Sequence, residues 1–246
     1  MLKSRMQMSC HASGHTTAAL RALSYDSPLA KFKDDTEGIG FYQAVKEIEE
    51  NFEEKKAELI RNLKAIAMDI FRADNMMISY TSAEEGLESI KPWVGKIKSG
   101  LHEEPKSDET PCIIHCKKRN EGFKTSSKVQ YVARVGNFID HGADYNGALQ
   151  ILKVILSYDY LWQNVRVKGG AYGCMSSFNR IGEGYFISYR DPNLRKTMET
   201  YKGVVNYLRK FTVDERDMNK YTIGTISNID RPMTPATKGN RFMNPY

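Results

Sequence analysis

Apolar residues in the first hundred positions recur at intervals of three and four, the spacing of helices that bury one face. A short segment at 16–23 is compatible with a helix, and two consecutive helical phases run from residue 41 to residue 71. Another helix is predicted from Ser82, because Ser-Ala-Glu-Glu forms a capping box ahead of its apolar positions. The apolar run at 76–80 predicts a strand between these helices.

The pattern changes after residues 99–111, a polar stretch without periodicity that we interpret as a linker. Short strands are predicted beyond it at 112–115 and 129–135. The broadest apolar stripe of the chain follows over residues 143–164 and predicts a long helix that faces a core.

Two further strands are predicted at 171–178 and 185–189, with a Gly-Glu-Gly turn between them. Helices then begin near Asp191 and near Asp214, each ahead of apolar positions at helical spacing. The order strand, strand, long helix, strand, strand, helix, helix predicts an α+β fold, in which an antiparallel or mixed sheet is backed by helices.

The section before the linker resembles the closing part of a similar unit, with two helices, a strand and a helix. The predicted organisation is therefore the end of one α+β domain at 1–99, a linker at 100–111, and most of a second α+β domain at 112–246.

Composition describes a globular protein with a substantial core, since 41% of the 246 residues are apolar and 27% are charged. No apolar run approaches the roughly 18 residues that a membrane span needs, so no membrane partner is expected. The net charge of +6 is spread among interleaved acidic residues. We interpret it as ordinary solvated surface and expect no nucleic-acid partner, although a basic nucleic-acid-binding module is kept as a minor alternative.

Four cysteines in a chain of this length do not form a disulfide framework and fit a reducing compartment. The first 25 residues lack Asp and Glu, which superficially resembles a mitochondrial transit peptide. An engineered start at Met1, inside a longer reading frame, is the interpretation that we prefer.

Two clusters have metal-ligand character, and neither is complete. His11 and His15 lie four residues apart, but the Glu that a zinc peptidase needs between them is absent. Cys112, His115 and Cys116 lack the partner half of a tetrahedral zinc site. A structural role is favoured for both clusters, and no metal ligand is assigned in this chain.

The stretch at 166–173, Arg-Val-Lys-Gly-Gly-Ala-Tyr-Gly, contains three glycines between a guanidinium and a phenol. Glycine lacks a Cβ, so another chain can approach this backbone closely. The local sequence alone favours a helix C-cap that runs into a strand. Its side chains also suit a surface that donates hydrogen bonds to a peptide.

This stretch, read as Val-Arg-Val-Lys-Gly-Gly-Ala-Tyr-Gly at 165–173, and Phe-Ile-Ser-Tyr-Arg-Asp-Pro-Asn at 186–193 together resemble the insulinase/pitrilysin-type zinc metallopeptidases. Their presequence-protease branch is the most similar. Weaker matches are Asn-Ile-Asp-Arg-Pro at 228–232 and Val-Ala-Arg-Val-Gly-Asn at 132–137. The similarity is strongest over residues 128–239.

The resemblance implies a domain of the LuxS/mitochondrial-processing-peptidase-like metallopeptidase fold. In that family, four related α+β domains enclose a chamber, and zinc is bound in the first domain by an inverted His-x-x-Glu-His motif. That motif is absent here. The chain is therefore expected to be a piece of the C-terminal half, holding the tail of the third domain and most of the fourth. Zinc is expected in the full-length protein, and none is expected to be bound by this fragment.

The resemblance also implies roles for the glycine stretch. Arg166 and Tyr172 match the family's pair that faces the zinc site, so both are expected to support catalysis by binding the substrate or its transition state. Gly169, Gly170 and Ala171 are expected to contact the peptide substrate. Cys174 and Met175 depart from the small residues expected after the motif.

The predicted function is the C-terminal part of a zinc metalloendopeptidase that degrades short unstructured peptides and is inactive as this fragment alone. Its expected partners are peptide substrates and the remaining N-terminal domains of the same chain. A bacterial cytoplasm is the expected location, with a mitochondrion or another organelle as the alternative. The rival is a non-catalytic scaffold or assembly subunit of the same fold, which would need neither Arg166 nor Tyr172.

Overall fold

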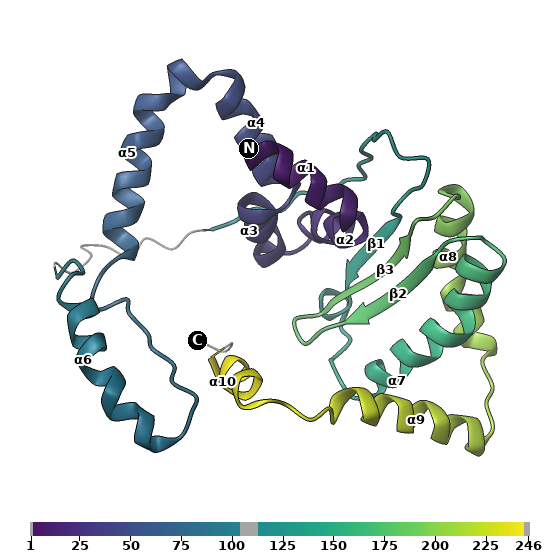
Figure 1. Ribbon diagram of the computed structural model, residues 1–246. Coiled ribbons are helices and arrows are strands. Elements are labelled where there is room, and N and C mark those ends of the chain that lie inside the picture. The colour runs from purple at the N-terminus through teal and green to yellow at the C-terminus, as the bar shows by residue number, and fades with distance from the viewer. Residues whose placement is uncertain (1, 104–112, 244–246) are drawn as a thin grey trace. The chain divides into compact units, whose positions relative to one another are not determined.

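This computed structural model describes residues 2–103 and 113–243 (Figure 1). The chain divides into two compact units, the first of which contains a three-stranded antiparallel sheet. We name the first the sheet unit, which comprises Met1–Glu49 and Ile113–Ile229. The second, the helical unit, comprises Glu50–Cys112 and Asp230–Tyr246.

The sheet has the order β1-β3-β2, formed by Ala133–Asn137, Glu183–Tyr189 and Gly173–Phe178 respectively. β2 and β3 form a hairpin whose turn contains Gly182 at φ +88°, a left-handed conformation that favours glycine. β3 is central, and Gly173 pairs with Tyr189 where β2 begins and β3 ends. The predicted strands at 171–178 and 185–189 are confirmed, and every pairing in this sheet is antiparallel.

Helices cover one face of the sheet and enclose the core. The predicted long helix begins later than expected, as α7 (Ala148–Ile155), and continues as two π-helical segments, η3 (Leu156–Tyr160) and η4 (Trp162–Val167). α8 (Arg195–Lys210) and α9 (Glu215–Ile229) follow as predicted. The buried core members are Val132, Leu156, Leu161, Val165, Ala171, Tyr201 and Val204. Cys174, Phe178 and Phe186 of the strands pack against this core.

α2 (Gly14–Leu23) contacts β1 and β3, and it confirms the helix predicted at 16–23. Ile187, whose neighbours Phe186 and Ser188 lie on the other side of β3, is almost fully buried. Gly14 allows a close approach, because a Cβ there would collide with the ring of Tyr131.

A buried ion pair joins α2 to the helix that follows it. α1 (Leu2–Ala12) and α3 (Pro28–Glu37) were not predicted, whereas α4 (Ile39–Glu50) confirms the helix expected from residue 41. Arg21 donates to Asp34 at 2.6 Å, and the Asp34 carboxylate also accepts from the backbone N–H groups of Ile39 and Gly40. These bonds connect α2, α3 and the start of α4, and the fully buried carboxylate is satisfied by them.

The helical unit contains α5 (Phe52–Ile70), the short 3₁₀ helix η1 (Glu84–Gly86), α6 (Leu87–Lys98) and α10 (Pro235–Met243). α5 confirms the second helical phase, and α10 was not predicted. The helix expected from Ser82 begins two residues later, at η1. The predicted strand at 76–80 is wrong: these residues form no ladder with any described segment, and Met77 and Ile78 are exposed. Apolar character alone does not supply the partner that a strand needs.

Some predicted segments differ from the structure around the linker. Residues 113–115 form no strand, and Cys112 lies outside the described residues, as does most of the predicted linker. The strand expected at 129–135 begins at Ala133, preceded by an isolated bridge between Gln130 and Asp191. α2 packs on the sheet, so the compact units do not follow the predicted division at 100–111. That division into two family-like domains stays a prediction.

Replacing Leu161 by Ala removes a side chain with 0% exposure from the core. We expect the free energy of unfolding of the sheet unit to fall by about 3 kcal/mol, because both burial and packing are lost. Leu194→Ala, at a position 52% exposed, is the control, with an expected change under about 0.5 kcal/mol. Chemical denaturation measures both, and equal losses would contradict this core.

Candidate functional site

The glycine stretch forms the loop that connects η4 to β2, and we name residues 168–172 the glycine loop. Gly170 has φ +80° and donates its N–H to the carbonyl of Arg166 at 2.8 Å. Ala171 donates to the carbonyl of Val165 at 3.1 Å. A glycine in the left-handed conformation, with N–H groups that donate to carbonyls of the last helical turn, is a common way to end a helix. The helix cap running into a strand, predicted from the local sequence, is therefore present.

Arg166 lies on the last turn of η4 and is partly buried. Its guanidinium stacks over the ring of Trp162 with 3.8 Å between the guanidinium carbon and the ring centroid. This cation–π contact fixes the side chain while leaving its N–H groups unused. Among the described residues, none pairs with Arg166 through a carboxylate or accepts a hydrogen bond from it.

Tyr172 lies at the other end of the glycine loop, and its side chain is 67% exposed. Its backbone N–H donates to the carbonyl of Tyr189 at 3.0 Å, with a longer contact to that of Arg190 at 3.4 Å. The two tyrosine rings meet edge to face with centroids 5.6 Å apart. No described residue hydrogen-bonds to the Tyr172 hydroxyl. The ring is held, and its polar end remains open to a ligand.

A row of aromatic rings, formed by Tyr189, Tyr131 and His15, packs behind the Tyr172 ring on the side of α2. The Tyr189 ring lies 5.8 Å from that of Tyr131 and 4.8 Å from the imidazole of His15, measured between centroids. His15 belongs to α2, so this helix helps to position the end of β3. In this arrangement His15 packs against aromatic rings, in agreement with the structural role favoured for it.

The three predicted peptide-contacting residues differ in what they expose. Gly170 is exposed, and its nearest obstacle to a Cβ is Pro192 at 3.6 Å, so a ligand can reach its backbone. Gly169 is partly buried, and a Cβ there would collide with the carbonyl of Val165. The methyl group of Ala171 lies in the core, which leaves only its backbone for a substrate contact. Their predicted role in peptide binding stays a prediction.

The segment from Tyr189 to Asn193 is a part of the site to which the sequence assigned no role. Asp191 is 0% exposed, and its carboxylate accepts from the Thr197 hydroxyl at 2.6 Å and from the Asn193 N–H at 2.8 Å. The Asn193 side-chain amide donates to the carbonyl of Gly169 at 2.5 Å. Two sequence signals lay in this segment, the helix start at Asp-Pro-Asn and the match to the family over 186–193, and neither reveals that Asn193 contacts the glycine loop.

Cys174, one of the two departures from the family pattern, is partly buried and packs against the core. Burial raises the pKa of its thiol from 9.0 to about 12, and the nearby charge of Arg166 opposes this only in part. The thiol is therefore protonated at neutral pH and unsuited to act as a nucleophile.

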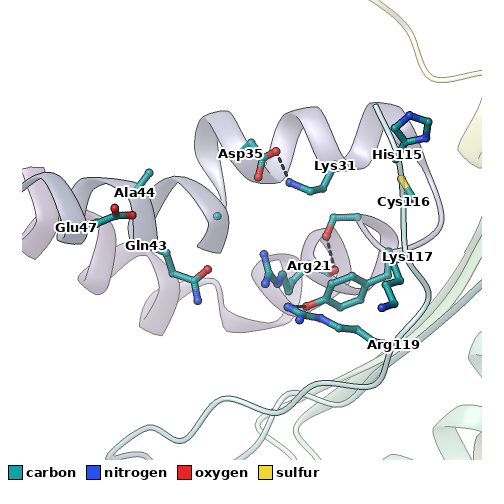
Figure 2. Close-up of a pocket in the computed structure, with 13 residues that line it drawn as sticks. Arg21, Lys31, Asp35, Gln43, Ala44, Glu47, His115, Cys116, Lys117 and Arg119 are labelled. Carbon is teal, nitrogen blue, oxygen red and sulfur yellow. Dashed lines mark hydrogen bonds and ion pairs between the residues drawn. The ribbon is translucent and has the colours of Figure 1, made fainter. Parts of the chain in front are cut away.

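A second candidate site is a cavity of about 460 Å³ lined by parts of α2, α3 and α4 and by residues 115–119 (Figure 2). Basic side chains dominate its lining, yet most are neutralised. Arg21 pairs with Asp34 and Glu121, Arg119 pairs with Glu121 at 2.8 Å, and Lys31 pairs with Asp35. These pairs account for the charges structurally, so we do not assign an anion site there.

The described residues contain no group of three or more His, Cys, Asp or Glu side chains that could bind a metal ion. The side chains of Cys10, His11 and Cys112 lie outside the description. The described side chains therefore do not fit the zinc site of the insulinase/pitrilysin-type peptidases that the sequence resembles. No helix of the described ranges is both long and apolar enough to cross a membrane.

A family model described as the PreP C-terminal domain matches residues 120–246, which is more than half of the chain and includes the glycine loop. The chain belongs to this family. The presequence-protease resemblance predicted from the glycine motif is thereby confirmed.

Curated relatives agree with this assignment. Protein HypA of Clostridium perfringens (strain 13 / Type A) is 40% identical over 244 residues, covering 99% of this chain and 25% of that protein. Presequence protease 1, chloroplastic/mitochondrial, of Arabidopsis thaliana is 28% identical over 238 residues, covering 96% and 22%. The mitochondrial presequence protease of Xenopus laevis is 24% identical over 264 residues, covering 94% and 25%. The chain spans about a quarter of the length of these relatives.

Gly170→Ala tests the conformation of the glycine loop. Because φ is +80° at this position, we expect the substitution to destabilise the sheet unit by about 1–2 kcal/mol. Gly147→Ala is the matched control, since Gly147 has φ −61° and open space around its Cα. Thermal or chemical unfolding measures the difference, and equal effects would refute the left-handed turn.

The buried thiol makes a separate prediction. Cys174 should resist iodoacetamide in the native protein at pH 8 and react after unfolding, as read by mass spectrometry of its peptide. Since burial raises the folded-state pKa to about 12, the stability that comes from the neutral thiol is complete below about pH 9 and declines as the pH rises from 9 towards 12. Rapid labelling of the folded protein at pH 8 would show that the packing against the core does not protect the Cys174 thiol.

Proposed function

We propose that this chain is the C-terminal part of a zinc-dependent metalloendopeptidase of the insulinase type, with the metallopeptidase-family fold, and that the glycine loop binds the peptide substrate. Membership of the PreP C-terminal domain family and the similarity to proteins named presequence proteases support a role in peptide hydrolysis. The observation that carries the site assignment is that Arg166 and Tyr172 flank an accessible glycine backbone with their donors unused.

The chemistry of the two donors suits an extended peptide. The Tyr172 hydroxyl can donate one hydrogen bond to a peptide carbonyl oxygen, and the Arg166 guanidinium offers several N–H groups in a planar fork. Negative charge develops on that oxygen when the peptide bond is attacked, and donors already held in position stabilise it without reorganisation. Trp162 and Tyr189 provide the positioning, through the stacking and edge-to-face contacts described above.

Zinc is proposed for the full-length protein, where it would activate the attacking water. The described residues offer no ligand set for it, so we place the zinc site on another part of that protein and propose that this chain alone is inactive. Stoichiometric zinc retained by this chain through gel filtration, together with chelator-sensitive peptide cleavage, would overturn that part of the proposal.

The proposed substrates are short unstructured peptides, and the proposed partners are the N-terminal domains of the same protein. The bacterial cytoplasm stays the predicted location. A non-catalytic scaffold of the same fold is the rival. Two unpaired donors beside an approachable backbone favour the enzyme, because a scaffold gains nothing from leaving Arg166 and Tyr172 without partners.

Tyr172→Phe tests the role of the hydroxyl in the full-length protein. We expect kcat/KM for an unstructured peptide to fall at least about tenfold, because one donor to the developing oxyanion is lost while the ring contact with Tyr189 remains. Tyr158→Phe is matched in chemistry and in exposure, 65% against 67%, and should change kcat/KM less than about twofold. Arg166→Lys should also lower kcat/KM, since the fork geometry is lost although the charge remains.

Peptide cleavage by the wild-type protein with no loss in Tyr172→Phe would reject the catalytic role of this residue. No cleavage by the wild-type protein, with zinc supplied and several unstructured peptides tried, would favour the scaffold.

A further inference from the structure

Both ends of the glycine loop are hydrogen-bonded to residues 189–193, at the end of β3 and just after it. At one end, the Tyr172 N–H donates to the carbonyls of Tyr189 and Arg190. At the other end, the Asn193 amide donates to the carbonyl of Gly169. These bonds connect residues about twenty positions apart, so the loop depends on a segment outside its own sequence.

Asn193 is itself held by a buried carboxylate. Its backbone N–H donates to one oxygen of Asp191 at 2.8 Å, and the Thr197 hydroxyl donates to the other at 2.6 Å. Asp191 is also paired with Gln130 through two backbone hydrogen bonds of 2.8 Å. A fully buried carboxylate with these donors resists movement, because any shift would leave one of its oxygens buried without a donor. The base of Asn193 is therefore fixed independently of the glycine loop.

The carbonyl that Asn193 binds is at the end of a helix, where backbone carbonyls lack partners within the helix. Lys196 donates to the neighbouring carbonyl of Lys168 at 3.0 Å, but this lysine is exposed and its side chain is long. The short amide of Asn193 makes the more restrictive contact. Two adjacent glycines otherwise give this backbone wide freedom, which the amide removes.

The backbone conformation of Arg190 also contributes to this attachment of the loop. It has φ +48°, and it is the only non-glycine residue with a positive φ in the described part of the chain. Such a conformation is unfavourable for arginine and persists only where the surroundings enforce it. Here Arg190 turns the chain from the end of β3 into the segment Asp191–Asn193. The carbonyls of Tyr189 and Arg190, which accept from the Tyr172 N–H, lie at this turn.

We propose that Asn193 is a positioning residue for the peptide-binding site. By fixing the carbonyl of Gly169, its amide sets the placement of the Tyr172 hydroxyl relative to Arg166 and thereby to the substrate. The inference rests on the proposed function, because it concerns how the same two donors are held. It adds a residue that does not itself touch the peptide.

The test is a double-mutant cycle in the full-length protein, with Asn193→Asp, Tyr172→Phe and the combined variant assayed on one unstructured peptide. Asn193→Asp removes the donor and faces the Gly169 carbonyl with a carboxylate. We expect it to lower kcat/KM at least about tenfold, because small displacements of catalytic groups have large effects. In the Tyr172→Phe background the same change should cost less than about threefold, since the hydroxyl that it positions is already absent.

Asn137→Asp is the matched control. Its side-chain amide also donates to a backbone carbonyl, that of Ile181 at 3.2 Å, but at the opposite end of β3. The same loss of a donor and gain of a charge there should leave kcat/KM within about twofold of the wild type.

The outcomes separate the two proposals. Equal losses from Asn193→Asp in both backgrounds would show a general structural role and overturn the positioning role. No loss from Asn193→Asp, with a clear loss from Tyr172→Phe, would overturn the positioning role and leave the proposed function standing. No loss from Tyr172→Phe would reject the catalytic role of Tyr172 and this inference with it, while peptide cleavage by the wild-type protein would still support the proposed function. If Asn193→Asp does not fold, Asn193→Ser, whose shorter side chain cannot reach Gly169, replaces it in the same cycle.

Discussion

The buried carboxylate of Asp191 is the constraint on which the candidate site depends. Its backbone joins Gln130 ahead of β1, and its side chain binds the start of α8 through Thr197. One residue therefore ties together the entry to β1, the exit of β3 and the first turn of the helix that covers the sheet. Removing a carboxylate from water is unfavourable unless donors replace the water, so these three segments are held in one arrangement.

The candidate site lies at the end of β3, where it receives support from both covered faces of the sheet. Core residues on one face fix η4 and thus Arg166, whereas the aromatic row from α2 on the other face supports Tyr172. Most of the basic side chains around the second cavity are paired with carboxylates. The side-chain donors of Arg166 and Tyr172, on either side of the loop backbone, have no hydrogen-bond partners among the described residues. This contrast in pairing, rather than cavity size, is the reason for which we propose the glycine loop as the functional surface.

Periodicity predicted α4, α5 and α8, and the glycine turn predicted the β2–β3 hairpin. The helical spacing in α8 corresponds to a face in the core, whereas no residue of α4 or α5 is buried, so the pattern predicted those helices but not the burial of their apolar faces. It failed at 76–80, where apolar residues have no partner strand, and it missed α10. The glycine motif identified Arg166 and Tyr172 as candidates. Asn193 and Asp191 could not be assigned roles from the sequence, since their contacts with Gly169 and Gln130 depend on long-range pairing.

The central claim is that the glycine loop faces the peptide, and photo-crosslinking tests it most directly. Benzoylphenylalanine in place of Tyr172, in the full-length protein, should form a covalent adduct with an unstructured peptide on irradiation. The same group in place of Tyr158, which is equally exposed, should not. An adduct at position 172 that is competed by unlabelled peptide is the expected result. Equal adducts at both positions, or adducts only at position 158, would contradict the account.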